Sequence, residues 1–167
     1  ELNINPIHFT DRRGLDHGTW AVLYHMYPNA EIPVAQMSIP RNLSFFDYFK
    51  LGRQLRELRK FGVMIIGSGN IVHNLQKINW QMDAPSESWA LEFDKLVEES
   101  INTRNYEQLF SVDHGQRQLF QLAHPTPEHF VPLLYVLGTL FDSDRFSYPC
   151  SFIQNATISM RSILFTS

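Results

Sequence analysis

Three histidines lie where the chain is predicted to pass from one element to the next, and their surroundings suggest acid–base or metal chemistry. His17 stands in an Asp-His-Gly turn before a predicted helix, His73 follows an apolar run, and His129 opens another predicted helix beside Glu128. Imidazole titrates near neutral pH and binds transition metals, so each ring could serve as acid, base or ligand. The alternative for each histidine alone is a structural or surface residue held by hydrogen bonds.

Other motifs in the sequence are weaker evidence for a functional site than these three histidines. His124 and His129 flank Glu128, but their five-residue spacing across a Pro-Thr-Pro turn matches no standard zinc pattern. The tripeptide at 67–69, Gly-Ser-Gly, lacks the third glycine of a dinucleotide-binding loop and the Gly-Lys-Thr of a phosphate loop. It is not Gly-x-Ser-x-Gly either, so a hydrolase that uses Ser68 beside His73 is the weakest alternative.

Hydrophobic periodicity and helix-end signals predict the elements that position these residues. Ser44 and Asp47 have capping-box spacing, and Gly62 is expected to end the same helix. The run VMIIG at 63–67 is typical of a strand covered on both faces, which indicates an α/β fold. Helices are expected over 20–27, 44–61, 86–101, 106–110, 116–122 and 127–140, and strands over 4–9, 32–39, 63–67 and 151–165.

Length and composition are typical of one ordinary domain over residues 1–167. The 14 Lys and Arg residues against 17 Asp and Glu give a net charge of −3, so neither nucleic acid nor an anionic membrane is expected as a partner. The longest apolar stretch, 131–141, is too short to span a bilayer. The single Cys150 excludes an internal disulfide, is expected to be a small packed residue, and favours a reducing, cytoplasmic compartment.

Four stretches around the histidines resemble the LigB superfamily of extradiol ring-cleavage dioxygenases, and most closely its DOPA 4,5-dioxygenase branch. They are DHGTWAVLYHMYP at 16–28, EIPVAQMSI at 31–39, SGNIVHNL at 68–75 and HPTPEHFVPLLYVLG at 124–138; TISMRS at 157–162 is a weaker match. These stretches follow the family's order along almost the whole chain. The resemblance implies a LigB-like α/β fold with a central, mostly parallel or mixed sheet and helices on both faces.

The resemblance also implies roles for the histidines. The family uses a mononuclear Fe(II), often replaced by Zn²⁺, to cleave the ring of a catechol with O₂. His129 would be a metal ligand, His73 a base close to the metal, and His17 a second acid–base group or a substrate contact. Glu128 would be a ligand or support the ligands, and Asn74 and His124 would support the site or contact the substrate.

This sequence departs from the family in one respect, because two further metal-binding histidines of the family lie in a longer N-terminal portion. Only fifteen residues precede Asp16, and His8 matches neither missing motif. We therefore expect a C-terminal portion that lacks N-terminal strands and is inactive alone, and that associates with a complementary N-terminal portion or with its own copies. The alternative from another class is a non-catalytic binding or assembly module that keeps the fold without a complete metal site.

Overall fold

The computed structural model describes residues 8–167, which divide after Asn42 into a first compact unit and a second one, Leu43–Ser167. The single domain expected from the sequence stays a prediction. Within the described residues, no helix has the length and apolar character needed to cross a membrane.

The described part of the first unit, residues 8–42, contains one helix, α1 (His17–Met26), which confirms the helix expected at 20–27. It begins three residues earlier because Asp16 caps it: the Asp16 Oδ1 accepts a hydrogen bond from the Thr19 backbone N–H at 3.1 Å. The strand expected at 32–39 is wrong, since this stretch is irregular and its apolar side chains are exposed. Most of the strand expected at 4–9 lies outside the described residues.

Helices dominate the second unit. The first is α2 (Phe45–Leu55), where Ser44 and Asp47 form the expected capping box, and it tightens into a 3₁₀ turn, Arg56–Phe61, that ends at Gly62 with a φ of 78°. The other α-helices are α3 (Ser88–Asn102), α4 (Glu107–Phe110), α5 (Val112–Gly115), α6 (Arg117–Ala123) and α7 (Val131–Gly138), with 3₁₀ turns at Leu75–Lys77 and Pro127–His129. The helix expected at 127–140 is thus divided after His129, and α5 was not expected.

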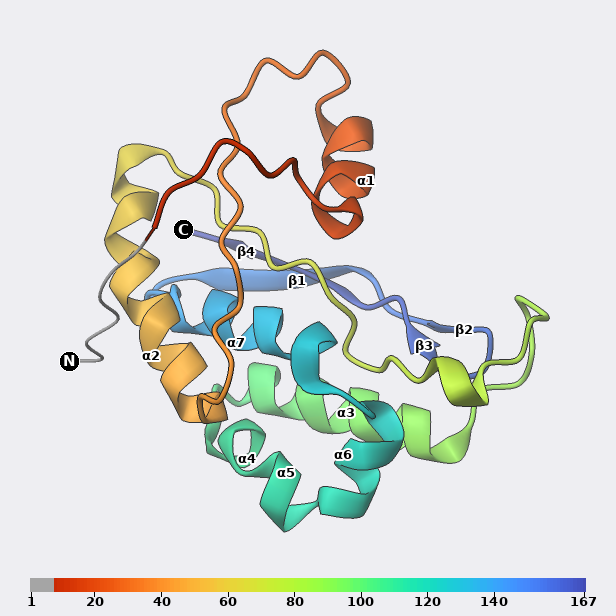
Figure 1. Cartoon of the computed structure of the whole chain (residues 1–167). Coiled ribbons are helices and arrows are strands. Elements are labelled where there is room, and N and C mark those ends of the chain that lie inside the picture. Colours follow the sequence, from red (N-terminus) through yellow and green to blue (C-terminus); the bar gives the residue numbers. More distant parts are fainter. Residues whose placement is uncertain (1–7) are drawn as a thin grey trace. The chain divides into compact units, whose positions relative to one another are not determined.

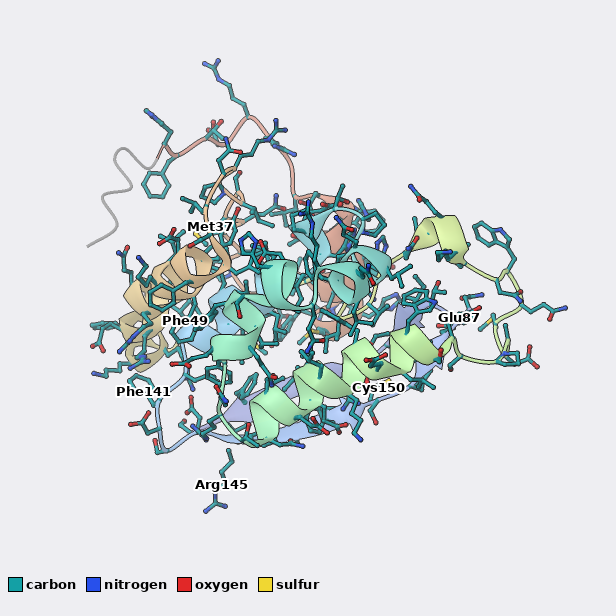
Figure 2. The ribbon with its side chains drawn as sticks, turned by 90° about the horizontal axis from the view of Figure 1, so that it is seen from below. Met37, Phe49, Glu87, Phe141, Arg145 and Cys150 are labelled. Atoms are coloured by element: carbon teal, nitrogen blue, oxygen red, sulfur yellow. The ribbon has the colours of Figure 1, made fainter. Side chains whose placement is uncertain are left out.

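The strands of the second unit form two antiparallel pairs. They are β1 (Arg145–Cys150), which pairs with β4 (Ser162–Thr166), and β2 (Ile153–Gln154), which pairs with β3 (Ile158–Ser159). Figure 1 shows β1 and β4 side by side as a two-stranded ribbon, and Figure 2 shows α3 lying along it. The α/β character is confirmed. The central parallel sheet is not formed by residues 8–167, whose ladders are all antiparallel and short.

The segment 63–67 differs most from expectation. It is extended but forms no strand, and Val63, Met64 and Ile66 expose 44, 56 and 44% of their surface. An apolar run becomes a doubly covered strand only where other strands flank it, and the described residues supply none for this run.

The core is built from aromatic rings and from one close helix contact. Phe93, Phe120 and Phe130 pack around each other at centroid distances of 5.6 to 6.0 Å, and Phe130 meets each of the other two rings edge to face. Helices α2 and α7 approach so closely that a β-carbon on Gly52 would meet the carbonyl oxygen of Tyr135. These contacts hold in place the helices that flank the candidate site.

Candidate active site

His73 and His129 stack ring on ring, although 55 residues separate them in the sequence. Their ring centroids are 3.7 Å apart and their planes differ by 19°. Both side chains are half-buried. Two charged imidazolium rings at this distance would repel, so the arrangement favours at least one neutral ring.

Backbone hydrogen bonds tie the two segments together on both sides of the stacked pair. The N–H of Asn70 donates to the carbonyl oxygen of His129 at 3.1 Å, and the N–H of His73 donates to that of Ala123 at 2.9 Å. An isolated antiparallel bridge also joins His73 to Ile158. The 70–73 segment is thus held between the turn that carries His129 and the β2–β3 hairpin.

Burial, and not the neighbouring charge, favours the neutral form of His73. Burial lowers the pKa of His73 below its ordinary value, and the nearby carboxylate of Glu128 opposes that change. Burial tends to raise the pKa of Glu128, but the Thr126 hydroxyl, which donates to its Oε1 at 2.7 Å, and both histidines lower it further. A carboxylate is therefore held beside two imidazole rings.

Two residues that shape the site were missed from the sequence. A β-carbon on Gly69 would collide with the carbonyl oxygen of His129, so only glycine lets the two segments approach this closely. The side chain of Asn70 donates to the carbonyl oxygen of Ser159 at 2.9 Å and fixes the hairpin on the other side. Both lie in the Ser-Gly-Asn motif, but the motif alone does not tell which backbone they approach.

His124 and Asn74 are buried residues of the two segments that carry the histidine pair. His124 is 1% exposed, and its Nε2 lies 2.7 Å from the carbonyl oxygen of Ile71. The buried Asn74 donates to the carbonyl oxygen of Leu122 at 2.7 Å and accepts from the Gln76 N–H at 3.0 Å. These bonds are structural, and the burial of His124 leaves it no surface for a substrate. The expected roles of both residues around a metal stay predictions.

His17 belongs to the first unit and is the first residue of α1, where its side chain is exposed. The helix end is stabilised by Gln36, whose Oε1 accepts hydrogen bonds from the Asp16 N–H at 2.9 Å and from the Thr19 hydroxyl at 3.0 Å. The acid–base role of His17 stays a prediction.

Among residues 8–167, no three His, Cys, Asp or Glu side chains gather in a way that could hold a metal ion. A ferrous site of the expected kind needs three protein ligands. The described residues therefore do not by themselves fit a complete metal centre.

A model of the catalytic LigB subunit of aromatic ring-opening dioxygenase matches residues 2–162. The chain belongs to the LigB family.

The LigB relatives include proteins from bacteria and plants. The chain is 38% identical to 4,5-DOPA dioxygenase extradiol of Escherichia coli K12 over 151 residues, 90% of this chain and 56% of that protein. It is 37% identical to 4,5-DOPA dioxygenase extradiol of Beta vulgaris over 134 residues, 80% of this chain and 49% of that protein. The chain thus spans about half the length of these relatives.

A solved structure agrees with the fold. The crystal structure of an uncharacterised protein from Escherichia coli K12 superposes with a TM-score of 0.81 at 37% identity, covering 90% of this chain and 62% of that one. This agreement extends the family assignment from sequence motifs to the three-dimensional arrangement.

Proposed function

We propose that this chain forms part of an extradiol dioxygenase that opens the ring of a DOPA-like catechol. The observation that carries the proposal is the stacked pair of His73 and His129, which brings together two family motifs 3.7 Å apart. Relatives named 4,5-DOPA dioxygenase extradiol, at 33 to 38% identity, support the substrate class.

In this proposal the partners are a small catechol and O₂, and both oxygen atoms enter the product as the ring bond beside the diol breaks. The neutral His73 accepts a proton from a catechol hydroxyl, because a neutral imidazole offers a free lone pair near neutral pH. Glu128 stabilises the charged ring that results. His17 would supply the second acid–base group or contact the substrate.

Fe(II), or Zn²⁺ in its place, belongs to this proposal as the metal of the complete protein, where it would activate O₂. His129 would be one of its ligands. Because the described residues hold no three-ligand group, the other ligands would come from a complementary N-terminal portion or a second copy. We therefore expect the 167-residue chain alone to turn over no catechol.

The test uses the complete natural gene product that contains this chain, loaded with Fe(II) without oxygen and then given DOPA and air. We expect a yellow ring-opened product. His73→Ala should abolish turnover and leave the metal content nearly intact, whereas His129→Ala should lower the metal content. His114→Ala, at a histidine with 84% of its side chain exposed, is the matched control. Equal metal loss in both site variants would overturn the division of roles.

A second candidate is a non-catalytic binding or assembly module, which the lack of a three-ligand group among residues 8–167 favours. Elemental analysis separates the two candidates. A dioxygenase should purify with close to one metal ion per site when complete, whereas a module should carry none. Light scattering of the 167-residue chain then reports whether copies associate.

A further inference from the structure

We propose that His124 is a positioning residue, which holds the segment carrying His73 and the turn carrying His129 in register through an Nε2–H bond to Ile71. The inference rests on the proposed function only in taking the histidine pair as part of the active site. Its geometry stands on contacts within the second unit.

The position of His124 connects the two halves of the pair. It directly follows Ala123, whose carbonyl oxygen accepts the His73 N–H at 2.9 Å, and it begins the turn that leads to His129. Its own ring reaches across to the carbonyl oxygen of Ile71, two residues before His73, at 2.7 Å. Residues 123 and 124 therefore hold the 71–73 segment by two hydrogen bonds, one to the N–H of His73 and one to the carbonyl oxygen of Ile71.

The hydrogen bond also identifies which ring nitrogen carries the proton. A carbonyl oxygen only accepts, so Nε2 must be the donor. The other nitrogen, Nδ1, is buried and has no hydrogen-bond partner within residues 8–167. A proton on Nδ1 would be an unpaired buried donor and would make the ring a buried charge, so the neutral Nε2–H tautomer is the one that fits.

The surrounding side chains fix the ring in this orientation. Phe93, Phe120 and Phe130 pack against it at centroid distances of 5.5, 5.4 and 5.3 Å. Burial lowers the pKa of His124 to about 4, in agreement with a neutral ring at physiological pH. Phe130 follows His129 directly, so packing against the His124 ring also limits how far the His129 turn can move.

The consequence is a division of labour among the three histidines of the second unit's site. His73 and His129 present their rings to each other, while His124 touches neither substrate nor solvent and fixes the distance between them. An apolar ring in place of His124 should fill the same space but leave the Ile71 carbonyl oxygen without its hydrogen bond. The rings of His73 and His129 should then separate.

The test compares His124→Phe and His124→Gln in the 167-residue chain by NMR. The phenylalanine keeps the ring and removes the donor, whereas the glutamine amide can place an N–H near the position of Nε2. The readout is the mutual upfield shift of the His73 and His129 ring protons, calibrated with His129→Ala. Ile101→Val, at a fully buried residue of α3, is the control for general loss of core packing.

We expect His124→Phe to lose most of this mutual shift while circular dichroism shows a folded chain, His124→Gln to restore it, and Ile101→Val to leave it unchanged. A folded His124→Phe chain that keeps the full shift would overturn the inference. If His124→Phe does not fold, the nitrogen spectrum of the unmodified chain decides, because a proton found on Nδ1 at neutral pH contradicts the proposed bond. None of these measurements requires turnover, so the inference and the proposed function fail independently.

Discussion

The guanidinium of Arg161 donates two hydrogen bonds to the Oδ2 of Asp94, from Nη2 at 2.6 Å and from Nε at 3.1 Å. Both side chains are largely buried. The same carboxylate accepts the Ser159 hydroxyl at 2.6 Å, and the Ser159 N–H donates to the carbonyl oxygen of Val72 at 3.0 Å. The ion pair therefore links helix α3 to the hairpin, and the hairpin to the residue before His73.

Replacing Asp94 should destabilise the chain strongly. Asp94→Ala leaves the buried guanidinium of Arg161 with Glu98 as its remaining ion-pair partner, and breaking a buried pair costs about 3–5 kcal/mol. Urea unfolding measures this loss. Lys60→Ala removes an exposed pair with Glu57 and should change the free energy of unfolding by under about 1 kcal/mol. Equal effects of the two changes would show that the buried pair has no special role.

Gly69→Ala tests the close approach of the two site segments. The added β-carbon would meet the carbonyl oxygen of His129, so the segments must part and the free energy of unfolding should fall by about 1–3 kcal/mol. The His73–His129 ring shifts should weaken at the same time. Gly115→Ala is the matched change, because nothing lies within 4 Å of its β-carbon. It should be neutral or stabilising by up to about 1 kcal/mol, and a similar loss in both variants would contradict the packing argument.

The stability of the chain should fall as the pH drops from 6.5 towards 4. In that window the unfolded chain protonates His124, whose ordinary pKa is 6.5, while the folded chain, with a pKa of about 4, does not. The loss amounts to about 3 kcal/mol by the bottom of the window and is absent above it. His73 contributes with the same sign, since its pKa is also lowered.

The control for this pH dependence is His124→Gln, which cannot titrate. Its free energy of unfolding, measured by urea titration at several pH values, should fall less steeply between pH 6.5 and 4. Asp144 and Glu128, whose pKa values are lowered in the folded chain, also reduce stability at the acidic end of this window, but they are present in both proteins and so cancel in the comparison. Parallel curves for the two proteins would rule out His124 as the source.

Two tyrosines should respond in opposite ways to loss of their hydroxyl. The Tyr135 hydroxyl is buried without a hydrogen-bond partner in the described part of the chain, and burial raises its pKa to about 12. Tyr135→Phe should therefore be neutral or stabilising by up to about 1 kcal/mol. Tyr148 donates to the Asn102 Oδ1 at 2.9 Å, so Tyr148→Phe should cost about 1 kcal/mol. Thermal unfolding of both variants gives the comparison, and a clear loss in Tyr135→Phe would reveal a missing partner.

Local signals in the sequence were sufficient where the structure depends on neighbours along the chain. The capping box of Ser44 and Asp47, the end of that turn at Gly62 and most helices were predicted because caps and periodicity act within a few residues. The strands at 32–39 and 63–67 failed for the opposite reason. An extended apolar run becomes a strand only through a partner elsewhere, and its own residues do not reveal whether that partner is present.

The candidate site shows the same limit. Histidine type and motif pointed to His73 and His129, but their stacking depends on the room that Gly69 leaves and on bonds from Asn70 and Ala123. His124 was expected near a metal, and its bond to Ile71 connects residues 53 positions apart. Spacing in the sequence carries no information on such pairings.

The backbone hydrogen bonds that the 70–73 segment donates to the 123–129 segment bear on how this protein can be recombined with its relatives. Every described bond between these segments lies within Leu43–Ser167, so both halves of the histidine pair belong to one compact unit. A chimaera with a crossover near Asn42 would keep both halves from one parent. A crossover between residues 75 and 123 would combine a His73 segment and a His129 turn that were never selected to fit each other.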